Sequence, residues 1–331
     1  MRNIRISLGF DMRAPDLGTS TRDLYAAAIE MAAHADDVGI DSINLMEHHA
    51  SEDGYLPQPF ILASAMAGQT KRIHFMLGAV ILPLHDPVDM AERIAVLDLV
   101  SGGRFNVIFG AGYVPGEFAM FGKSLKDRAK LMDEGVETIL RALDGESFDY
   151  QGRPVMVRPL PIRDPRDIVM VGGGVPASAR RAARFDVGFG PMKGDIVDIY
   201  LAECEKHGRE PRTYYRPGGG MPLGIHLCED PEAGWAALEP HALHVVTEYA
   251  KWAALEGDAT NSPFKGLDNP EALRRSGLFV AMTPEQLLGM VSANPEINMI
   301  GLHPLLGGLA PEEGWKSLKL LESILPKLRE L

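Results

Sequence analysis

Residues 73–82 read IHFMLGAVIL, a nearly continuous apolar run. A strand of a parallel sheet reads this way when helices cover both of its faces. Helical patterns stand on either side of the run, at residues 57–70 and 87–100, and Pro87 suits the first turn of the second one. The stretch therefore predicts a parallel strand between two helices.

The same alternation of short apolar runs and helical periods extends over most of the chain. The eight candidate strands are residues 4–10, 41–46, 73–82, 105–109, 167–171, 187–189, 223–228 and 298–303. Most of them are followed by a helical pattern. Eight β–α units in order favour a closed (β/α)8 TIM barrel over an open doubly wound sheet, so we expect an α/β fold with residues 1–331 in a single barrel domain.

Two stretches depart from this alternation. Residues 148–163 are polar and rich in proline, which indicates an excursion or a hairpin. Residues 231–297 lack the strand–helix period and read as mostly helical. We therefore expect a helical insertion at 231–297, before the last strand.

Composition and charge exclude several classes of protein. Hydrophobic residues make up 46% of the chain and charged residues 24%, as in soluble globular proteins. The net charge of −12 and the absence of a basic run argue against nucleic acid as a partner. No stretch reaches the ~20 apolar residues of a membrane span, and the N-terminus lacks the apolar run of a signal peptide. Cys204 and Cys228 form no CxxC pair. We expect a cytoplasmic protein without membrane contact.

The segment Glu47-His48-His49 follows the second candidate strand. In a barrel the active site lies at the C-terminal ends of the strands. Alternation along a strand places Glu47 and His49 on one side and His48 on the other, so the three cannot easily bind one metal ion. The first candidate strand also lacks the His-x-His pattern of metal-dependent barrels, and we predict no metal site. A histidine at a strand end that only hydrogen-bonds a loop is the structural alternative.

Residues 172–178, GGGVPAS, join the fifth candidate strand to its helix. Glycines let backbone amides approach an anion, and the start of a helix favours negative charge. Pro176 suits the first helical turn, and Ser178 adds a hydroxyl donor. Phosphate binding is one interpretation and a tight turn is the other. The segment is not GxGxxG, which argues against a Rossmann dinucleotide site.

Small residues and a histidine mark two further strands. Gly78-Ala79 interrupts the third candidate strand, where a glycine indicates close approach of a ligand or packing against a large side chain. His303 ends the last candidate strand and is followed by Pro304 and a glycine pair, which suits a pocket. A histidine within the core is the alternative for His303.

Several ordered motifs resemble those of the bacterial-luciferase family of flavin monooxygenases. They are LMEHH at 45–49, GAVILP at 78–83, DPV at 86–88, LDLVSGGRF at 97–105, GAGY at 110–113, EF at 117–118 and the 172–178 loop. The resemblance covers about residues 1–230, and the last strand and helix more loosely.

The resemblance implies where a flavin and a substrate would bind. The flavin ring would lie against the third strand, with a non-proline cis peptide between Gly78 and Ala79. The implied cofactor-binding residues are Gly78, Ala79, Gly110, Gly173, Gly174, Val175 and Ser178. His48 matches a histidine implicated in acid–base chemistry, with Glu47 as the neighbour expected to orient it. The expected substrate pocket contains His49, Tyr113, Met192 and His303.

The chain also departs from the luciferase pattern. The family positions that carry a cysteine and a phosphate-binding arginine after the fourth strand correspond to Gly110 and Ala111. Light emission is therefore not expected, and another group must hold the phosphate.

The resulting expectation is a monooxygenase that uses reduced FMN and O2 to oxygenate a small organic substrate. Because no nicotinamide fingerprint is visible, a separate NAD(P)H:flavin reductase would supply the reduced flavin. Hydride transfer with the deazaflavin F420 is the alternative, and a non-catalytic flavin-binding protein is a third. A homodimer is expected from the resemblance and from the frequency of twofold assemblies.

Overall fold

The computed structural model describes residues 4–216, 221–256 and 264–331, and its chain divides into two compact units. Unit 1 contains Met1–Asn44, His49–Pro57 and Gly218–Leu331, and unit 2 contains Leu45–His48 and Gln58–Pro217. Strand β2 (Ser42–Leu45) carries the chain from the first unit to the second. Each unit is described by itself below.

The strands of unit 1 run parallel, in the order β10-β9-β11-β1. They are β1 (Arg5–Phe10), β9 (Gly224–Leu227), β10 (Phe279–Met282) and β11 (Met299–Leu302). Strand β1 pairs with β11 from Arg5 opposite Met299 to Leu8 opposite Leu302. All four residues of β9 and five of the six residues of β1 are buried, which agrees with their largely apolar sequences.

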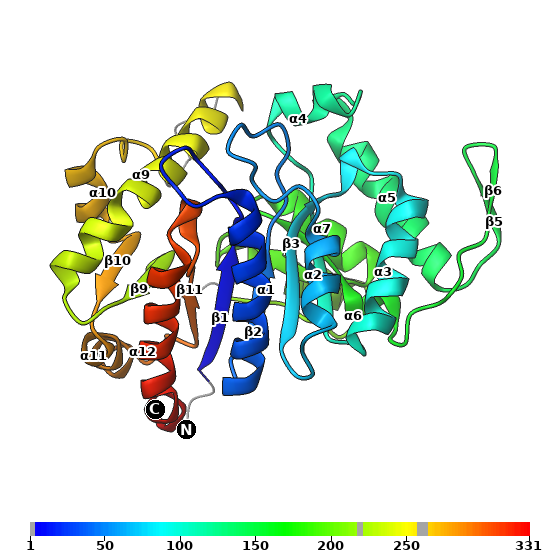
Figure 1. Cartoon of the computed structure of the whole chain (residues 1–331). Helices are drawn as coiled ribbons and strands as arrows, with labels where there is room; N and C mark the ends of the chain where they lie inside the picture. Colours follow the sequence, from blue (N-terminus) through cyan, green and yellow to red (C-terminus); the bar gives the residue numbers. More distant parts are fainter. Residues whose placement is uncertain (1–3, 217–220, 257–263) are drawn as a thin grey trace. The chain divides into compact units, whose positions relative to one another are not determined.

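The helices of unit 1 lie along these strands (Figure 1). They are α1 (Thr21–Val38), α9 (Pro231–Glu256), α10 (Pro270–Ser276), α11 (Pro284–Ala293) and α12 (Pro311–Glu330). Helix α1 shows why these segments fold as they do. Ser20 caps its first turn, Gly39 ends it at a φ of 86°, and its apolar face from Leu24 to Ala35 is buried.

The strands of unit 2 also run parallel, in the order β3-β4-β7-β8. They are β3 (His74–Ile81), β4 (Phe105–Gly110), β7 (Val169–Gly173) and β8 (Gly188–Pro191). Because all four point the same way, their C-terminal ends lie at one edge. A separate antiparallel hairpin, β5 (Phe148–Tyr150) with β6 (Arg153–Val155), occupies the predicted excursion (Figure 1).

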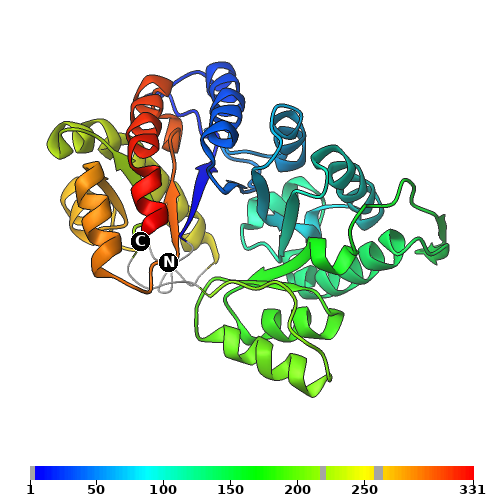
Figure 2. The same cartoon turned by 90° about the horizontal axis from the view of Figure 1, so that it is seen from below.

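Unit 2 also contains helices, several of which lie along its strands (Figure 2). They are α2 (Pro59–Ala67), α3 (Pro87–Ser101), α4 (Pro115–Met120), α5 (Arg128–Leu143), α6 (Pro165–Ile168), α7 (Pro176–Phe185) and α8 (Ile196–Lys206). Helix α3 packs against α2 and α5, and α7 packs against α8 and β7. None of the helices within the described ranges is both long and apolar enough to span a membrane.

All eight expected strands are present, and three details differ from the prediction. Residues 167 and 168 belong to the short helix α6 rather than to the fifth strand, because Asp164 caps a turn there. Helix α4 was not expected. The 231–297 segment, expected to be a helical insertion, contains α9, α10 and α11 and also the four-residue strand β10, which pairs with β9. Residues 257–263 of that segment lie outside the described residues.

An arginine without solvent contact is the main polar feature of unit 1. Arg13 is 0% exposed, and its Nη1 donates a hydrogen bond to Asp53. Its guanidinium carbon lies 4.5 Å from the ring centre of Tyr55, 4.9 Å from that of Trp252 and 5.3 Å from that of Tyr249. Arg13 thereby joins the loop after β1 to the 49–57 segment and to α9. Cation–π contacts of this kind are strongest where water is excluded.

The pKa values of the two carboxylates near Arg13 are shifted in opposite directions, although the charge of Arg13 lowers both. Burial alone would raise the pKa of Asp53, but a hydrogen bond from His244 and the charge of Arg13 outweigh it and hold that pKa far below its usual value. For Asp11 burial prevails over the charge of Arg13, and its pKa is raised. The Asp11 carboxylate also accepts the backbone N–H of Gly307, 3.0 Å away. Asp53 is therefore the ionised partner of the pair.

We predict that Arg13→Ala lowers the free energy of unfolding by about 3–5 kcal/mol, because it leaves Asp53 buried without its cation. Arg275→Ala is the control, since Arg275 forms an exposed pair with Glu271 and should change stability by less than ~1 kcal/mol. Urea titration measures both. Equal effects of the two substitutions would contradict a structural role of the buried pair.

Acidification should also test this pair. The pKa of Asp53 is lower in the folded protein than in the unfolded one, where an aspartate titrates at about 3.9. The stability that Asp53 contributes is therefore complete above that value and is lost as the pH falls below it. Asp53→Asn should therefore be less stable than the parent at neutral pH and should lose less stability between about pH 5 and pH 2. Parallel stability curves for the two proteins over that range would contradict the prediction.

Candidate functional site

Three glycines of unit 2 lie against the side chain of Ile108. A Cβ atom built on Gly172 would lie 2.6 Å from Ile108, one on Gly190 2.8 Å and one on Gly78 3.0 Å. The Ile108 side chain fills the space that a Cβ atom would need at these three positions, so they favour glycine. For Gly78 this supports the packing interpretation. Packing of this density leaves little tolerance for added atoms.

The C-terminal ends of β3 and β4 meet closely. Ile81 pairs with Gly110, and a Cβ on Gly110 would lie 2.9 Å from the Ala79 side chain. The pairing register shifts between Gly78 and Val80, so Ala79 is an extra residue in β3. The peptide bond between Gly78 and Ala79 is cis, as the resemblance implied. The predicted residues Gly78, Ala79 and Gly110 therefore lie together at one strand edge.

A buried carboxylate holds His48 at the same edge. His48 Nδ1 lies 2.8 Å from Glu117 Oε1, and the two residues are 7% and 0% exposed. An ionised carboxylate only accepts hydrogen bonds, so the proton lies on Nδ1 of His48 when Glu117 is ionised. The ring of Tyr113 meets the His48 ring edge-on, with centroids 5.9 Å apart. His48 is thus held on two sides.

Helix α4 brings Glu117 to this position. Phe118, the next residue, is buried against Ile81 at the end of β3 and Leu84 beyond it. Gly112, at a φ of 72°, passes so close to Phe118 that a Cβ would lie 2.8 Å from that ring. The apolar contact of Phe118 therefore fixes the direction of the Glu117 side chain.

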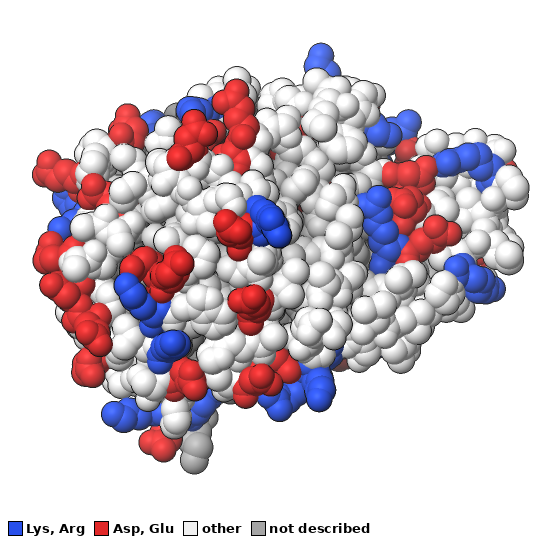
Figure 3. Space-filling model, in the orientation of Figure 1, with Lys and Arg blue, Asp and Glu red and all other residues white. Residues whose placement is uncertain are grey.

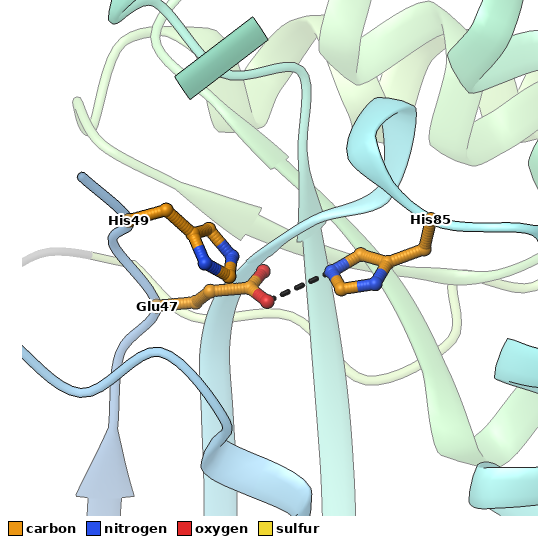
Figure 4. Close-up of side chains that lie close together, drawn as sticks. All are labelled: Glu47, His49 and His85. Atoms are coloured by element: carbon orange, nitrogen blue, oxygen red, sulfur yellow. Dashed lines mark hydrogen bonds and ion pairs between the residues drawn. The ribbon is translucent and has the colours of Figure 1, made fainter. Parts of the chain in front are cut away.

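Glu47 does not have the partner that the sequence suggested. Its Oε1 lies 2.8 Å from His85 Nε2 (Figure 4). Its Oε2 accepts the backbone N–H of Ile81 at 2.5 Å. The residue that pairs with His48 Nδ1 is Glu117. Neighbouring strand residues point to opposite sides, which is why Glu47 and His48 reach different partners. His49, also drawn in Figure 4, is 5% exposed and belongs to unit 1.

The glycine run at the end of β7 contains three residues with three different surroundings. Gly172 makes room for Ile108. Gly173 has a φ of 146°, and a Cβ there would lie 2.9 Å from Ser178. Gly174 has an ordinary φ, and a Cβ there would come no closer than 3.6 Å to Met192. Packing and backbone geometry thus account for the first two glycines but not for Gly174.

The loop then enters α7, with Val175 at the N-cap and Pro176 at the first helical position. Ser178 is buried, and its hydroxyl donates to the carbonyl of Val175 at 2.7 Å. Ser178 therefore holds the loop closed in this structure. Val175 and Met192, on either side of the loop, are 58% and 76% exposed. A helix start next to an open glycine offers backbone amides to an anion.

His303 lies in unit 1, at the end of β11. Burial lowers its pKa to about 4, although a hydrogen bond with the backbone of Leu223 favours the charged form. A Cβ on Gly9 would lie 2.3 Å from the His303 ring, so the imidazole depends on that glycine. His303 is consequently neutral near pH 7 and does not serve as a general acid there.

Two site residues were not singled out from the sequence. Glu117 was part of a family motif, and its position in a short apolar segment between Pro115 and Phe118 was the available signal. For His85, the available signal was a titratable residue just beyond the end of the third strand, two positions after Pro83. Their pairing with His48 and Glu47 requires the three-dimensional fold.

A comparison with protein-family models shows the family of this chain. The family model described as luciferase-like monooxygenase matches residues 8–283. The chain belongs to this family. The 4-hydroxyprotoasukamycin monooxygenase of Streptomyces nodosus subsp. asukaensis is 27% identical over 69% of this chain and 65% of its own length. The chain thus matches less than two thirds of that relative.

Solved structures of luciferase-like enzymes share the fold over nearly the whole chain. Monooxygenase RslO1 from Streptomyces bottropensis has a TM-score of 0.73 and 24% identity over 98% of this chain and 99% of its own. The oxygenating component of 3,6-diketocamphane monooxygenase from Pseudomonas putida, solved with FMN, has a TM-score of 0.71 and 20% identity over 97% of both chains. An F420-dependent secondary alcohol dehydrogenase has a TM-score of 0.66 and 16% identity over 99% of both. The expected α/β fold class of the TIM-barrel type is confirmed.

We predict that Gly174→Val weakens FMN binding by about tenfold or more and leaves the thermal midpoint nearly unchanged. Valine fits the open space beside Met192 but covers the amides of the loop. Gly173→Ala is the matched comparison, because its positive φ and its contact with Ser178 should cost about 1–3 kcal/mol of stability. Flavin fluorescence titration and calorimetry separate the two effects. Unchanged FMN affinity in Gly174→Val would move the phosphate site elsewhere.

Proposed function

We propose that the protein is a flavin-dependent monooxygenase that uses reduced FMN and O2 to oxygenate a small organic substrate. The observation that carries the proposal is the His48–Glu117 pair, buried at the strand edge that also bears the open Gly174 loop. Membership of the luciferase-like monooxygenase family supports it. A binding site and a proton-transferring group thus lie on one set of strand ends, as barrel enzymes arrange them.

The residues present fit an FMN cofactor. The backbone of Gly173, Gly174 and Val175, at the start of α7, would hold the phosphate. Ala79 and Gly110 leave a surface of small side chains at the end of β3 and β4 for the flavin ring. Bound reduced FMN supplies the activation of oxygen, and the protein supplies position and electrostatics. Ser178 supports the phosphate loop through its hydrogen bond to Val175.

His48 is the proposed proton-transfer residue, and Glu117 is the residue that orients it. Because Glu117 engages Nδ1, Nε2 is the nitrogen that gives or takes a proton. The carboxylate also stabilises the imidazolium when His48 is protonated. The residues proposed to contact the substrate are His49, Tyr113, Met192 and His303. Tyr113 limits rotation of the His48 ring, and His303 would meet a substrate as a neutral group.

Reduced flavin would come from a separate NAD(P)H:flavin reductase, since the chain lacks a dinucleotide fingerprint. The shared fold of an F420-dependent dehydrogenase favours F420 as the second candidate cofactor. Absorption spectra of the protein titrated with reduced FMN and with reduced F420 distinguish the two. Oxygen consumption that depends on an added organic substrate then tests the monooxygenase activity.

We predict that His48→Ala lowers the rate of substrate oxygenation by roughly 100-fold or more, in the range expected when a general acid–base group is lost. FMN affinity should stay within a few-fold, because the proposed phosphate contacts lie on the loop after β7. Glu117→Gln should lower the rate less, by about tenfold, since the amide oxygen still accepts from Nδ1 while the charge is lost. Turnover at the parental rate in His48→Ala would show that His48 is only a structural hydrogen-bonding group.

An apolar surface on unit 2 supports the proposal of a homodimer. Helix α2 carries no charged residue, and Figure 3 shows an uncharged area over it. Ile61 of α2 is 68% exposed, and Val96, Leu99 and Val100 of the adjoining α3 are 43–49% exposed. Exposed apolar side chains gathered on two packed helices are typical of a protein interface. A second copy of the chain is the proposed occupant.

We expect light scattering to give about twice the 36.0 kDa chain mass, and Ile61→Asp to shift it toward the monomer. Leu17→Asp is the control, because Leu17 is 53% exposed but lies in unit 1, away from α2 and α3 in the sequence. A parent that stays at the mass of one chain over a concentration series would refute the dimer.

A further inference from the structure

Glu47 contacts β3 at two points beyond Gly78. Its backbone N–H donates to the carbonyl of Ala79 at 3.2 Å, and its carboxylate accepts the N–H of Ile81 at 2.5 Å. The second carboxylate oxygen lies 2.8 Å from His85 Nε2 (Figure 4). Glu47 is 2% exposed. One residue thus holds alternate backbone positions of a neighbouring strand.

These contacts fall where β3 is least supported by β4. Gly78 pairs with Ile108 and Val80 with Phe109, which leaves Ala79 without a position opposite it. An extra residue of this kind interrupts the hydrogen-bonded ladder and lets the strand bend. Glu47 supplies hydrogen bonds to residues on both sides of Val80 from the other side of the strand. The position of the bulge therefore depends on Glu47 as well as on β4.

The pair formed by Glu47 and His85 extends this support to α4. His85 follows the 3-10 turn Leu82–Leu84, and its ring lies against Phe121, with centroids 6.3 Å apart. Phe121 also packs against the apolar group of Ile81, Leu84 and Phe118. That group fixes the helix that carries Glu117. A change at Glu47 would consequently reach both β3 and α4.

We propose that Glu47 is a positioning residue, whose carboxylate fixes the backbone of residues 79–81 so that the end of β3 can receive the flavin ring. The inference rests on the proposed binding of FMN at this strand. A carboxylate that is 2% exposed and engaged through both oxygens would have to release Ile81 or His85 before it exchanged a proton with a substrate. The contacts with Ile81 and His85 require the length of the Glu47 side chain and do not require it to exchange a proton.

Two conservative variants separate a positioning role from an acid–base role. Glu47→Gln keeps the length and an oxygen that can accept from Ile81, and its amide N–H can donate to His85 in the other tautomer. Glu47→Asp keeps the charge but is one methylene shorter. We expect Glu47→Gln to keep FMN affinity and kcat within about threefold of the parent, and Glu47→Asp to weaken FMN binding by about tenfold. Glu137, an exposed residue of α5, is substituted in the same two ways as a control.

The opposite order overturns the proposal. If Glu47→Asp keeps FMN affinity and turnover while Glu47→Gln loses turnover with FMN still bound, Glu47 acts in proton transfer. Hydrogen exchange of the Ile81 amide is read on the same proteins without flavin, and we expect faster exchange in Glu47→Asp only. A parent that binds no FMN would refute the proposed function, while the Ile81 amide would still report whether Glu47 holds the strand.

Discussion

The side chain of Ile108 lies where three neighbouring strands have glycines, and this contact governs the geometry of unit 2. Gly78 on β3, Gly172 on β7 and Gly190 on β8 each pass so close to it that no Cβ could be added without a shift. Parallel pairing brings the C-terminal ends of these strands to one edge. The histidine, the carboxylates and the glycine loop of the proposed site all depend on that edge. The close packing of Ile108 against the three glycines thus limits which substitutions the strands that carry the proposed site can accept.

Two buried carboxylates at this edge form hydrogen bonds with different histidines. Glu117 pairs with His48, and Glu47 pairs with His85 and the backbone of Ile81. Each pair is nearly removed from water, where an unpartnered charge would be costly. Their separation means that the histidine proposed for proton transfer and the strand proposed to receive the flavin are held by different residues.

The sequence was sufficient for the order of strands and helices, since apolar runs and helical periods are local properties of the chain. It also placed His48 and the Gly173–Gly174 loop at strand ends. It failed where the partner lies far away in the chain. Glu117 is 69 residues from His48, and no periodic pattern links them. Strand β10 was missed because it has only four residues and lies between two helical segments.

The two histidine–carboxylate pairs engage opposite nitrogens of their rings. Glu117 meets Nδ1 of His48, whereas Glu47 meets Nε2 of His85. An imidazole that donates from Nδ1 and one that donates from Nε2 are different tautomers, and the two nitrogens of a neutral ring differ in chemical environment. Histidine labelled with a nitrogen isotope would therefore give two distinguishable ring signatures from one edge of the protein. The signal of His48 would report on the residue proposed to transfer protons, and the signal of His85 would report on β3 through its contact with Glu47.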